Sequence, residues 1–163
     1  MLDKESKILI VDDNEEILIA IQFFLEKHFL NIKVLSNPNL IPNAINKESF
    51  DIYVLDMNFS SSQKSGNEGL YWMREILKED PNSVIIFITA YADIQLAVKA
   101  VREGAMDFIP KPWENKKLLT TILAALELRK SKLKVEKLNQ KQQHLSANIQ
   151  KDFQLILGES EQM

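Results

Sequence analysis

Three aspartates, a threonine and a lysine each stand directly after a short apolar run rich in isoleucine and valine, or close behind it. Asp12 and Asp13 follow the first such run, Asp56 a later one, and Thr89 and Lys111 the last two. Three carboxylates gathered together repel one another unless a cation neutralises them, and oxygen-only ligation beside a phosphate indicates Mg²⁺. The amine of Lys111 and the hydroxyl of Thr89 are suitable partners for phosphoryl oxygens. The set therefore indicates magnesium-dependent phosphoryl chemistry.

Asp56 is the expected nucleophile of this set. When Mg²⁺ neutralises developing charge, a carboxylate oxygen can attack phosphorus in line. Asp56 stands alone after its run, whereas Asp12 and Asp13 are adjacent and suited to hold the metal. Each residue alone has an ordinary interpretation, since aspartate after a strand often caps a helix or forms a turn. Their joint occurrence favours the functional interpretation.

Five apolar runs alternate with amphipathic stretches of helical length. The expected strands cover residues 7–11, 31–35, 51–55, 84–88 and 107–109. The expected helices cover residues 15–27, 68–79 and 94–103, with another ending near Lys47. Such alternation predicts an α/β fold with right-handed crossovers and a parallel sheet covered on both faces. Ligand chemistry in such sheets lies at the carboxyl ends of the strands, where the five chosen residues stand.

The composition excludes several other classes of protein. Apolar residues make up 45% and charged residues 26%, which is typical of a soluble globular chain. There is no cysteine and there are two distant histidines, so disulfides and the usual zinc sites are excluded. No apolar run approaches the roughly 18 residues of a membrane helix, and the amino terminus has no secretory signal pattern. We expect a cytoplasmic protein with no membrane partner.

Four segments together resemble the receiver domain of bacterial two-component response regulators. They are Ile8-Leu9-Ile10-Val11-Asp12-Asp13, Val54-Leu55-Asp56, Ile88-Thr89-Ala90 and Asp107-Phe108-Ile109-Pro110-Lys111-Pro112. The resemblance covers roughly residues 5–125. It implies a flavodoxin-like (βα)5 fold with a five-stranded parallel sheet in the order 2-1-3-4-5. It also implies that Asp56 accepts phosphate from a sensor histidine kinase.

The same resemblance implies roles for the remaining site residues. Asp12, Asp13, Asp56 and the backbone carbonyl of Asn58 would bind Mg²⁺. Thr89 and Lys111 would hold the phosphoryl oxygens, and Thr89 and Phe108 would form a two-state switch. In that switch the Thr89 hydroxyl moves inward and the Phe108 ring follows. This motion changes the face made by helix four, strand five and helix five. The alternative interpretation of Phe108 is that it only packs in the core.

Three local features follow from the comparison with that family. The Lys111-Pro112 bond is expected to be cis. Residues 59–68 form a longer, serine-rich loop without the proline usual in the family. The loop beside the site is therefore expected to differ in geometry from that of the family. Asn58 and Tyr91 lie where the family tunes dephosphorylation.

The carboxyl-terminal part is predicted to be a long basic helix. No Gly or Pro occurs from residue 115 to residue 156, and residues 127–151 carry a net charge of +5, leaving −8 elsewhere. Seven positions fit a heptad pattern, of which five are apolar: Leu128, Val135, Gln142 and Ile149, with Ser131, Leu138 and Leu145. This favours a weak parallel coiled coil and a homodimer over a single helix packed on its own domain. Because no aromatic residue accompanies the basic ones, a solvated helix face is favoured over direct nucleic-acid binding.

The last residues resemble the opening of the AAA+ domain of sigma-54-dependent activators. The segment 153–163 contains Gly158-Glu159-Ser160 and ends in Met163, and the receiver-like part also resembles the nitrogen-regulatory branch. We therefore expect a receiver over residues 1–125, a helical linker over 126–152, and the start of a truncated AAA+ ATPase domain over 153–163. No G-x-x-x-x-G-K-[ST] loop occurs, so we expect no ATP hydrolysis here and no enzyme beyond slow self-dephosphorylation.

Four other classes of function compete with this interpretation. A response regulator with a different output domain is the nearest. An aspartyl-nucleophile phosphatase requires a second aspartate two residues after the first. Asn58 occupies that position here, and its side chain cannot transfer a proton. A flavodoxin-like binding domain requires a hydroxyl-rich phosphate-binding loop after the first strand. Asp12 and Asp13 stand there instead and would repel the phosphate of the ligand. An interaction domain that is never phosphorylated would not need the complete five-residue set.

Overall fold

The computed structural model describes residues 3–59 and 67–161. Its centre is a five-stranded parallel sheet in the order β2-β1-β3-β4-β5, which confirms the predicted topology. The strands are β1 (Asp3–Val11), β2 (Phe29–Leu35), β3 (Ile52–Asp56), β4 (Val84–Thr89) and β5 (Asp107–Pro110). The helices are α1 (Glu15–Leu25), α2 (Ile41–Lys47), α3 (Asn67–Glu79), α4 (Ile94–Glu103) and α5 (Asn115–Glu161).

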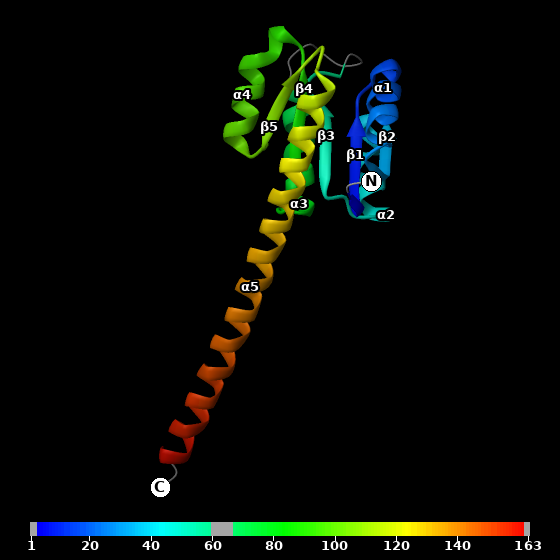
Figure 1. Ribbon diagram of the computed structural model, residues 1–163. Coiled ribbons are helices and arrows are strands. Elements are labelled where there is room, and N and C mark those ends of the chain that lie inside the picture. The colour runs from blue at the N-terminus through cyan, green and yellow to red at the C-terminus, as the bar shows by residue number, and fades with distance from the viewer. Residues whose placement is uncertain (1–2, 60–66, 162–163) are drawn as a thin grey trace. The chain divides into compact units, whose positions relative to one another are not determined.

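Helices cover both faces of the sheet, as Figure 1 shows for α1 and α3. Each strand sends alternate side chains to opposite faces, so two separate apolar clusters form. Leu9, Leu55 and Phe87 pack with α2, α3 and α4 on one face, while Ile8 and Val54 pack with α1 and α5 on the other. The strands β3 and β4 are buried along their whole length, which explains why their sequences show no polar alternation.

Local signals in the sequence set several of the helix ends. Asn14 caps α1, its side chain accepting hydrogen bonds from the backbone N–H groups of Glu16 and Ile17. Gly104 ends α4 with φ 137°, a backbone conformation that side chains with a Cβ rarely adopt, as its place in the sequence predicts. Helix α1 ends at Leu25, two residues before the predicted end. A short 3₁₀ turn, Pro38–Leu40, precedes α2.

Helix α5 is continuous from Asn115 to Glu161, so the structure has no break at residue 126 or residue 153. The chain divides into two compact units, Met1–Arg129 and Lys130–Met163. The first unit includes the buried α5 residues Leu118, Ile122, Ala125 and Leu126. Among the described helices, none is long and apolar enough to cross a membrane.

In the second unit the apolar side chains are exposed. Leu138, Leu145 and Ile149 are 55–65% exposed, and all three belong to the predicted heptad pattern. A helix with such a stripe and no covering layer in its own unit is typical of a helix that pairs with another chain.

Candidate functional site

The predicted site residues come together at the carboxyl edge of the sheet. Asp12 follows β1 directly, Asp56 is the last residue of β3, Thr89 is the last of β4, and Lys111 follows β5. In the register of the sheet Asp56 pairs with Ile88, so the ends of β3 and β4 are level. The strands are parallel, and this is why residues so far apart in sequence meet at one edge.

Three carboxylates form a cluster in which Asp12 and Asp56 are buried and Asp13 is half-buried. Asp12, Asp13 and Asp56 each offer a carboxylate oxygen, and these atoms lie within 4.8 Å of one another. The amine Nζ of Lys111 lies 3.1 Å from Asp56 Oδ1 and 3.2 Å from Asp12 Oδ2. One cation of the protein thus bridges two of the three acids.

Burial makes this cluster electrostatically costly. It raises the pKa of Asp56 to about 7, an effect to which the nearby Asp12 carboxylate adds and which the Lys111 amine opposes. Burial also raises the pKa of Asp12 above its usual range. Burial would lower the pKa of Lys111, but the two carboxylates more than offset this and raise it. A further positive charge is what the site lacks.

The donor set of the cluster fits a magnesium ion. Carboxylate oxygens are the ligands that Mg²⁺ prefers. Oδ2 of Asp12 is buried and accepts no hydrogen bond from the residues described, although it lies near the Lys111 amine. Asn58, the fourth predicted ligand, belongs to the same corner, because its backbone N–H donates to the Asp56 carboxylate.

Thr89 and Phe108 lie near this edge without contacting the acids through an observed hydrogen bond. Thr89 is buried, and its hydroxyl donates to the carbonyl of Ala90 at 3.2 Å. Phe108 is partly buried and packs on the cluster that also holds α4. The Lys111-Pro112 peptide bond is cis, as expected.

Two further polar residues near the site, Asp93 and Glu68, were not predicted from the sequence. Asn58 Nδ2 donates to Asp93 Oδ2 at 2.7 Å, and Phe59 N–H donates to Glu68 Oε2 at 3.2 Å. Asp93 lies in the short 3₁₀ turn Tyr91–Asp93, and Tyr91 itself is 78% exposed. The first bond joins residues 35 positions apart and the second joins residues nine apart across a loop, so no helical or strand periodicity could have found either of them.

Helix α3 approaches the site very closely at Gly69. A Cβ added there would lie 2.7 Å from the carbonyl oxygen of Met57, the residue directly after Asp56. Only glycine allows this approach. The longer loop predicted over residues 59–68 lies mostly outside the described residues, which resume at residue 67.

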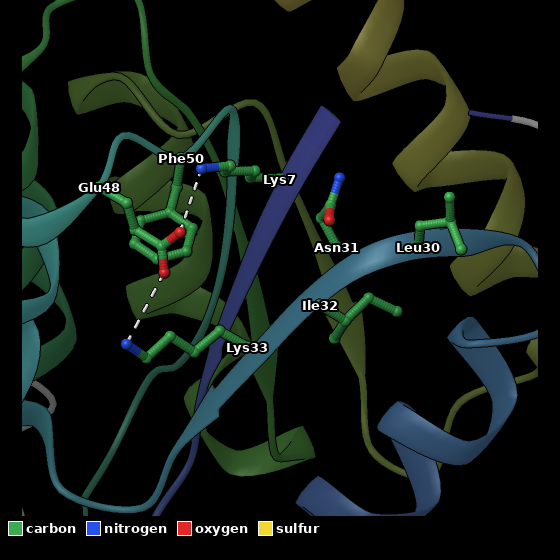
Figure 2. Close-up of a pocket in the computed structure, with 7 residues that line it drawn as sticks. All are labelled: Lys7, Leu30, Asn31, Ile32, Lys33, Glu48 and Phe50. Atoms are coloured by element: carbon green, nitrogen blue, oxygen red, sulfur yellow. Dashed lines mark hydrogen bonds and ion pairs between the residues drawn. The ribbon is translucent and has the colours of Figure 1, made fainter. Parts of the chain in front are cut away.

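The other edge of the sheet, where the strands begin, carries a hollow that is lined by lysines paired with a glutamate. Lys7 and Lys33 face Glu48 at 3.1 and 3.7 Å across it, with Phe50 and Asn31 beside them (Figure 2). These ion pairs are more than a third exposed, and pairs of that kind contribute little. The described residues hold one cluster of potential metal ligands, and it is the one at the carboxyl edge.

That opposite edge also holds a buried arginine that sequence reasoning missed. Arg129 of α5 donates from Nε to Asp51 Oδ1 at 3.0 Å and from Nη1 to Asp80 Oδ2 at 2.9 Å. Its side chain is 9% exposed. Both acids are also held by backbone groups, Asp51 by the N–H of Lys7 and Asp80 by that of Asn82. The bond pattern ties α5 to the turns before β3 and β4.

Comparison with known proteins supports this fold. Residues 8–123 match the family described as the response regulator receiver domain. The chain is 30% identical over 161 residues to the response regulator protein TodT of Pseudomonas putida F1, covering 96% of this chain and 69% of that one.

Two solved structures are also similar. An N-terminal signal receiver domain of a response regulator from Bacteroides fragilis is 44% identical, with a TM-score of 0.68 over 74% of this chain and 96% of that one. NtrX from Brucella abortus in complex with ADP is 30% identical, with a TM-score of 0.74 over 82% of this chain and 30% of that one.

Proposed function

Since the chain belongs to the response regulator receiver domain family, we propose that Asp56 is its phosphoacceptor and that a sensor histidine kinase supplies the phosphoryl group. The observation that carries the proposal is the cluster of Asp12, Asp13 and Asp56 with the Lys111 amine between two of them. A buried carboxylate beside a cation, at the carboxyl edge of a parallel sheet, is placed to attack phosphorus.

The residues that would hold Mg²⁺ are Asp12, Asp13, Asp56 and the backbone carbonyl of Asn58. When bound, the ion neutralises the charge that develops on the transferred group. Oδ2 of Asp12 is buried and accepts no hydrogen bond from the described residues, although the Lys111 amine lies 3.2 Å away; this and the raised pKa of Asp56 both support a further cation here. Because Asp13 is half-buried, it leaves the cluster open to solvent on its side.

In the proposed transfer an oxygen of Asp56 forms a bond to phosphorus while the P–N bond to the kinase histidine breaks. The electron pair of that bond stays on the imidazole nitrogen, and the aspartate becomes an acyl phosphate. Lys111 already contacts Asp56 Oδ1 and is placed to pair with a phosphoryl oxygen instead. The chain is thus a substrate and switch of the kinase, with self-dephosphorylation as its own slow reaction.

The test of this proposal is phosphorylation by a small donor. With acetyl phosphate and Mg²⁺, we expect one phosphoryl group per chain, mapped to Asp56 by mass spectrometry of the borohydride-reduced peptide. Asp56→Asn should take up none, because a carboxamide cannot form the acyl phosphate. A matched change of an exposed acid, Glu26→Gln, should leave incorporation intact. Incorporation into the Asn variant, or none into the unsubstituted chain with Mg²⁺, contradicts the proposal.

We propose that Thr89 and Phe108 report the phosphorylated state. The Thr89 hydroxyl now donates to Ala90, a weak partner that a phosphoryl oxygen would outcompete. Phe108 is only partly buried, and we propose that its ring becomes more buried when the Thr89 hydroxyl moves inward. Phosphorylation would bias this pair and change the face formed by α4, β5 and α5.

The second unit is proposed to pair two copies of the chain. Exposed Val135, Leu138, Leu145 and Ile149 form the stripe, and Gln142 and Ser131 at seam positions would weaken the pairing. A weak coiled coil suits a dimer whose strength phosphorylation adjusts.

We expect a chain ending after Ser131 to be monomeric by sedimentation at concentrations where the longer chain is dimeric. This end keeps Arg129 and removes most of the exposed stripe. The double change Leu138→Ser with Leu145→Ser in the longer chain should give the same result without shortening it. A dimer that survives both changes would place the interface on the first unit.

The output of the switch is proposed to be a sigma-54-dependent AAA+ ATPase domain. The resemblance of residues 153–163 supports this, although Gln162 and Met163 lie outside the described residues. The likeness to NtrX supports it too, since that longer protein was solved with ADP.

One observation favours a different output domain as a second candidate. The similarity to TodT extends over 161 residues and so includes the second unit. Because those residues are 69% of TodT, that protein has about 230 residues, which leaves room outside the match for one small domain. Any codons that follow Met163 discriminate: a nucleotide-binding loop supports the ATPase, and a short helical DNA-binding module supports the alternative.

A further inference from the structure

One hydrogen bond beside Asp56 is not used by the transfer chemistry described above. Asn58 Nδ2 donates to Asp93 Oδ2 at 2.7 Å, which joins the segment after β3 to the turn before α4. The oxygen of the same carboxamide, Oδ1, is buried and has no hydrogen-bond partner among the described residues. An unpaired buried acceptor is unfavourable, and it indicates a donor that arrives with the site's ligands.

Asp93 decides which end of the Asn58 carboxamide faces it. An ionised carboxylate only accepts hydrogen bonds, so it binds the amide NH₂ group and repels the amide oxygen. Rotating the carboxamide by half a turn would lose the 2.7 Å bond and set two oxygens against each other. Asp93 therefore keeps Oδ1 turned away from itself and free for another donor.

The place of Asn58 limits what that donor is. Its backbone N–H donates to the Asp56 carboxylate, so the residue adjoins the proposed phosphoacceptor. The described residues at this edge include two buried oxygens that accept no hydrogen bond. One of them, Asp12 Oδ2, belongs to the carboxylate cluster and lies beside the Lys111 amine. Asn58 Oδ1 is neutral and lies on a different residue from the three clustered acids. A water molecule, with two donor hydrogens, suits it.

We propose that Asp93 is a positioning residue for the loss of the phosphoryl group from Asp56, acting by orienting Asn58 so that Oδ1 accepts a hydrogen bond from the attacking water. This inference rests on the proposed function of Asp56. The water oxygen bonds to phosphorus as the P–O bond to Asp56 breaks. The electron pair returns to the carboxylate, and both water protons leave on the product, dihydrogen phosphate. Asn58 takes no proton and only aligns the water.

The experiment follows the lifetime of the acyl phosphate in the full chain. Protein phosphorylated with acetyl phosphate is freed of the donor, and phosphate release is followed in saturating Mg²⁺. Loss of one aligned hydrogen bond is expected to slow release about fivefold in Asp93→Ala and in Asn58→Ala. The double variant should be no slower than Asn58→Ala alone, because Asp93 acts only through Asn58.

Two further variants separate orientation from charge and from folding. Asp93→Asn keeps the size and one acceptor, but its own amide pairs with either end of Asn58, so we expect a lifetime between those of the unsubstituted chain and Asp93→Ala. It also serves if Asp93→Ala fails to fold. Glu26→Ala, on the exposed end of α1, removes a charge elsewhere and should leave the lifetime unchanged. The Mg²⁺ dissociation constant of the unphosphorylated variants, measured by calorimetry, should change less than about twofold.

Distinct results overturn the inference. An equal lifetime in Asp93→Ala overturns it while leaving Asp56 as phosphoacceptor intact. Slowing by Asp93→Ala that persists in the Asn58→Ala background shows that the Asp93 charge acts directly. A loss of Mg²⁺ affinity parallel to the slowing places Oδ1 among the metal's ligands. No phosphate on Asp56 in any protein overturns both this inference and the proposed function.

Discussion

At pH 8 and without divalent cations, the Asp56→Asn variant is expected to be about 2 to 4 kcal/mol more stable to unfolding than the unsubstituted chain. The reason is the buried carboxylate, whose pKa is raised to about 7 by burial and by the neighbouring Asp12. Asparagine has the same shape and carries no charge. Lys111 keeps a partner in Asp12 after the substitution.

The sign of the pH dependence follows from the direction of that shift. The folded chain holds a proton on Asp56 at pH values where the unfolded chain has lost it. Stability from this group is therefore present below about pH 4 and is lost as pH rises through about 7. The advantage of the Asn variant should be small at pH 4.5 and reach its full size near pH 8.

Urea unfolding of both proteins at the two pH values, in EDTA, measures this difference. Glu26→Gln, a change to the exposed acid at the C-cap of α1, is the matched control and should behave as the unsubstituted chain does. Adding Mg²⁺ at pH 8 should stabilise the unsubstituted chain and reduce the gap, because a bound cation offsets the repulsion. A gap that is the same at both pH values would show that buried charge is not what destabilises the site.

Arg129→Ala is expected to lower the free energy of unfolding by about 2 to 4 kcal/mol. The substitution leaves Asp51 and Asp80 without their shared cation, and both acids are at least partly buried. It also removes the tie between α5 and the turns before β3 and β4. Lys134→Ala, five residues later on the same helix and exposed, should change stability by less than about 0.5 kcal/mol.

The same contacts decide where a stable receiver ends. A chain that stops at residue 125 lacks the buried Leu126 as well as Arg129. We expect it to be less stable than a chain ending at residue 131 by at least the effect of Arg129→Ala, measured by urea unfolding. Equal stability of the two chains, or an Arg129→Ala variant as stable as the unsubstituted one, would show that the arginine contributes nothing net.

Much of the fold was predictable because its signals are local. Continuous apolar runs mark the strands, since strands buried on both faces need no polar alternation. Alternation of such runs with helices and right-handed crossovers limits the topologies to parallel sheets, and the order 2-1-3-4-5 followed from the resemblance to the receiver family. Boundaries were less exact: β2 begins at Phe29, two residues before the predicted start, because Phe29 packs under α1 in the core.

The acidic site was predictable for a topological reason. Parallel strands bring their carboxyl ends to one edge, so residues that follow different strands must meet there. The Lys111 amine lies 3.1 Å from Asp56 and 3.2 Å from Asp12, as that rule predicts. Residue type and position along the chain sufficed.

The sequence by itself determined the strands, their parallel arrangement and the composition of the acidic edge, since each depends on residue type and spacing. Only the tertiary structure decided that Asp93 holds Asn58 and that Arg129 joins Asp51 and Asp80. These bonds link residues 35 to 78 positions apart, and they depend on how loops and a helix face lie after packing. A side chain's partner across such a distance is set by geometry, and no local pattern encodes it.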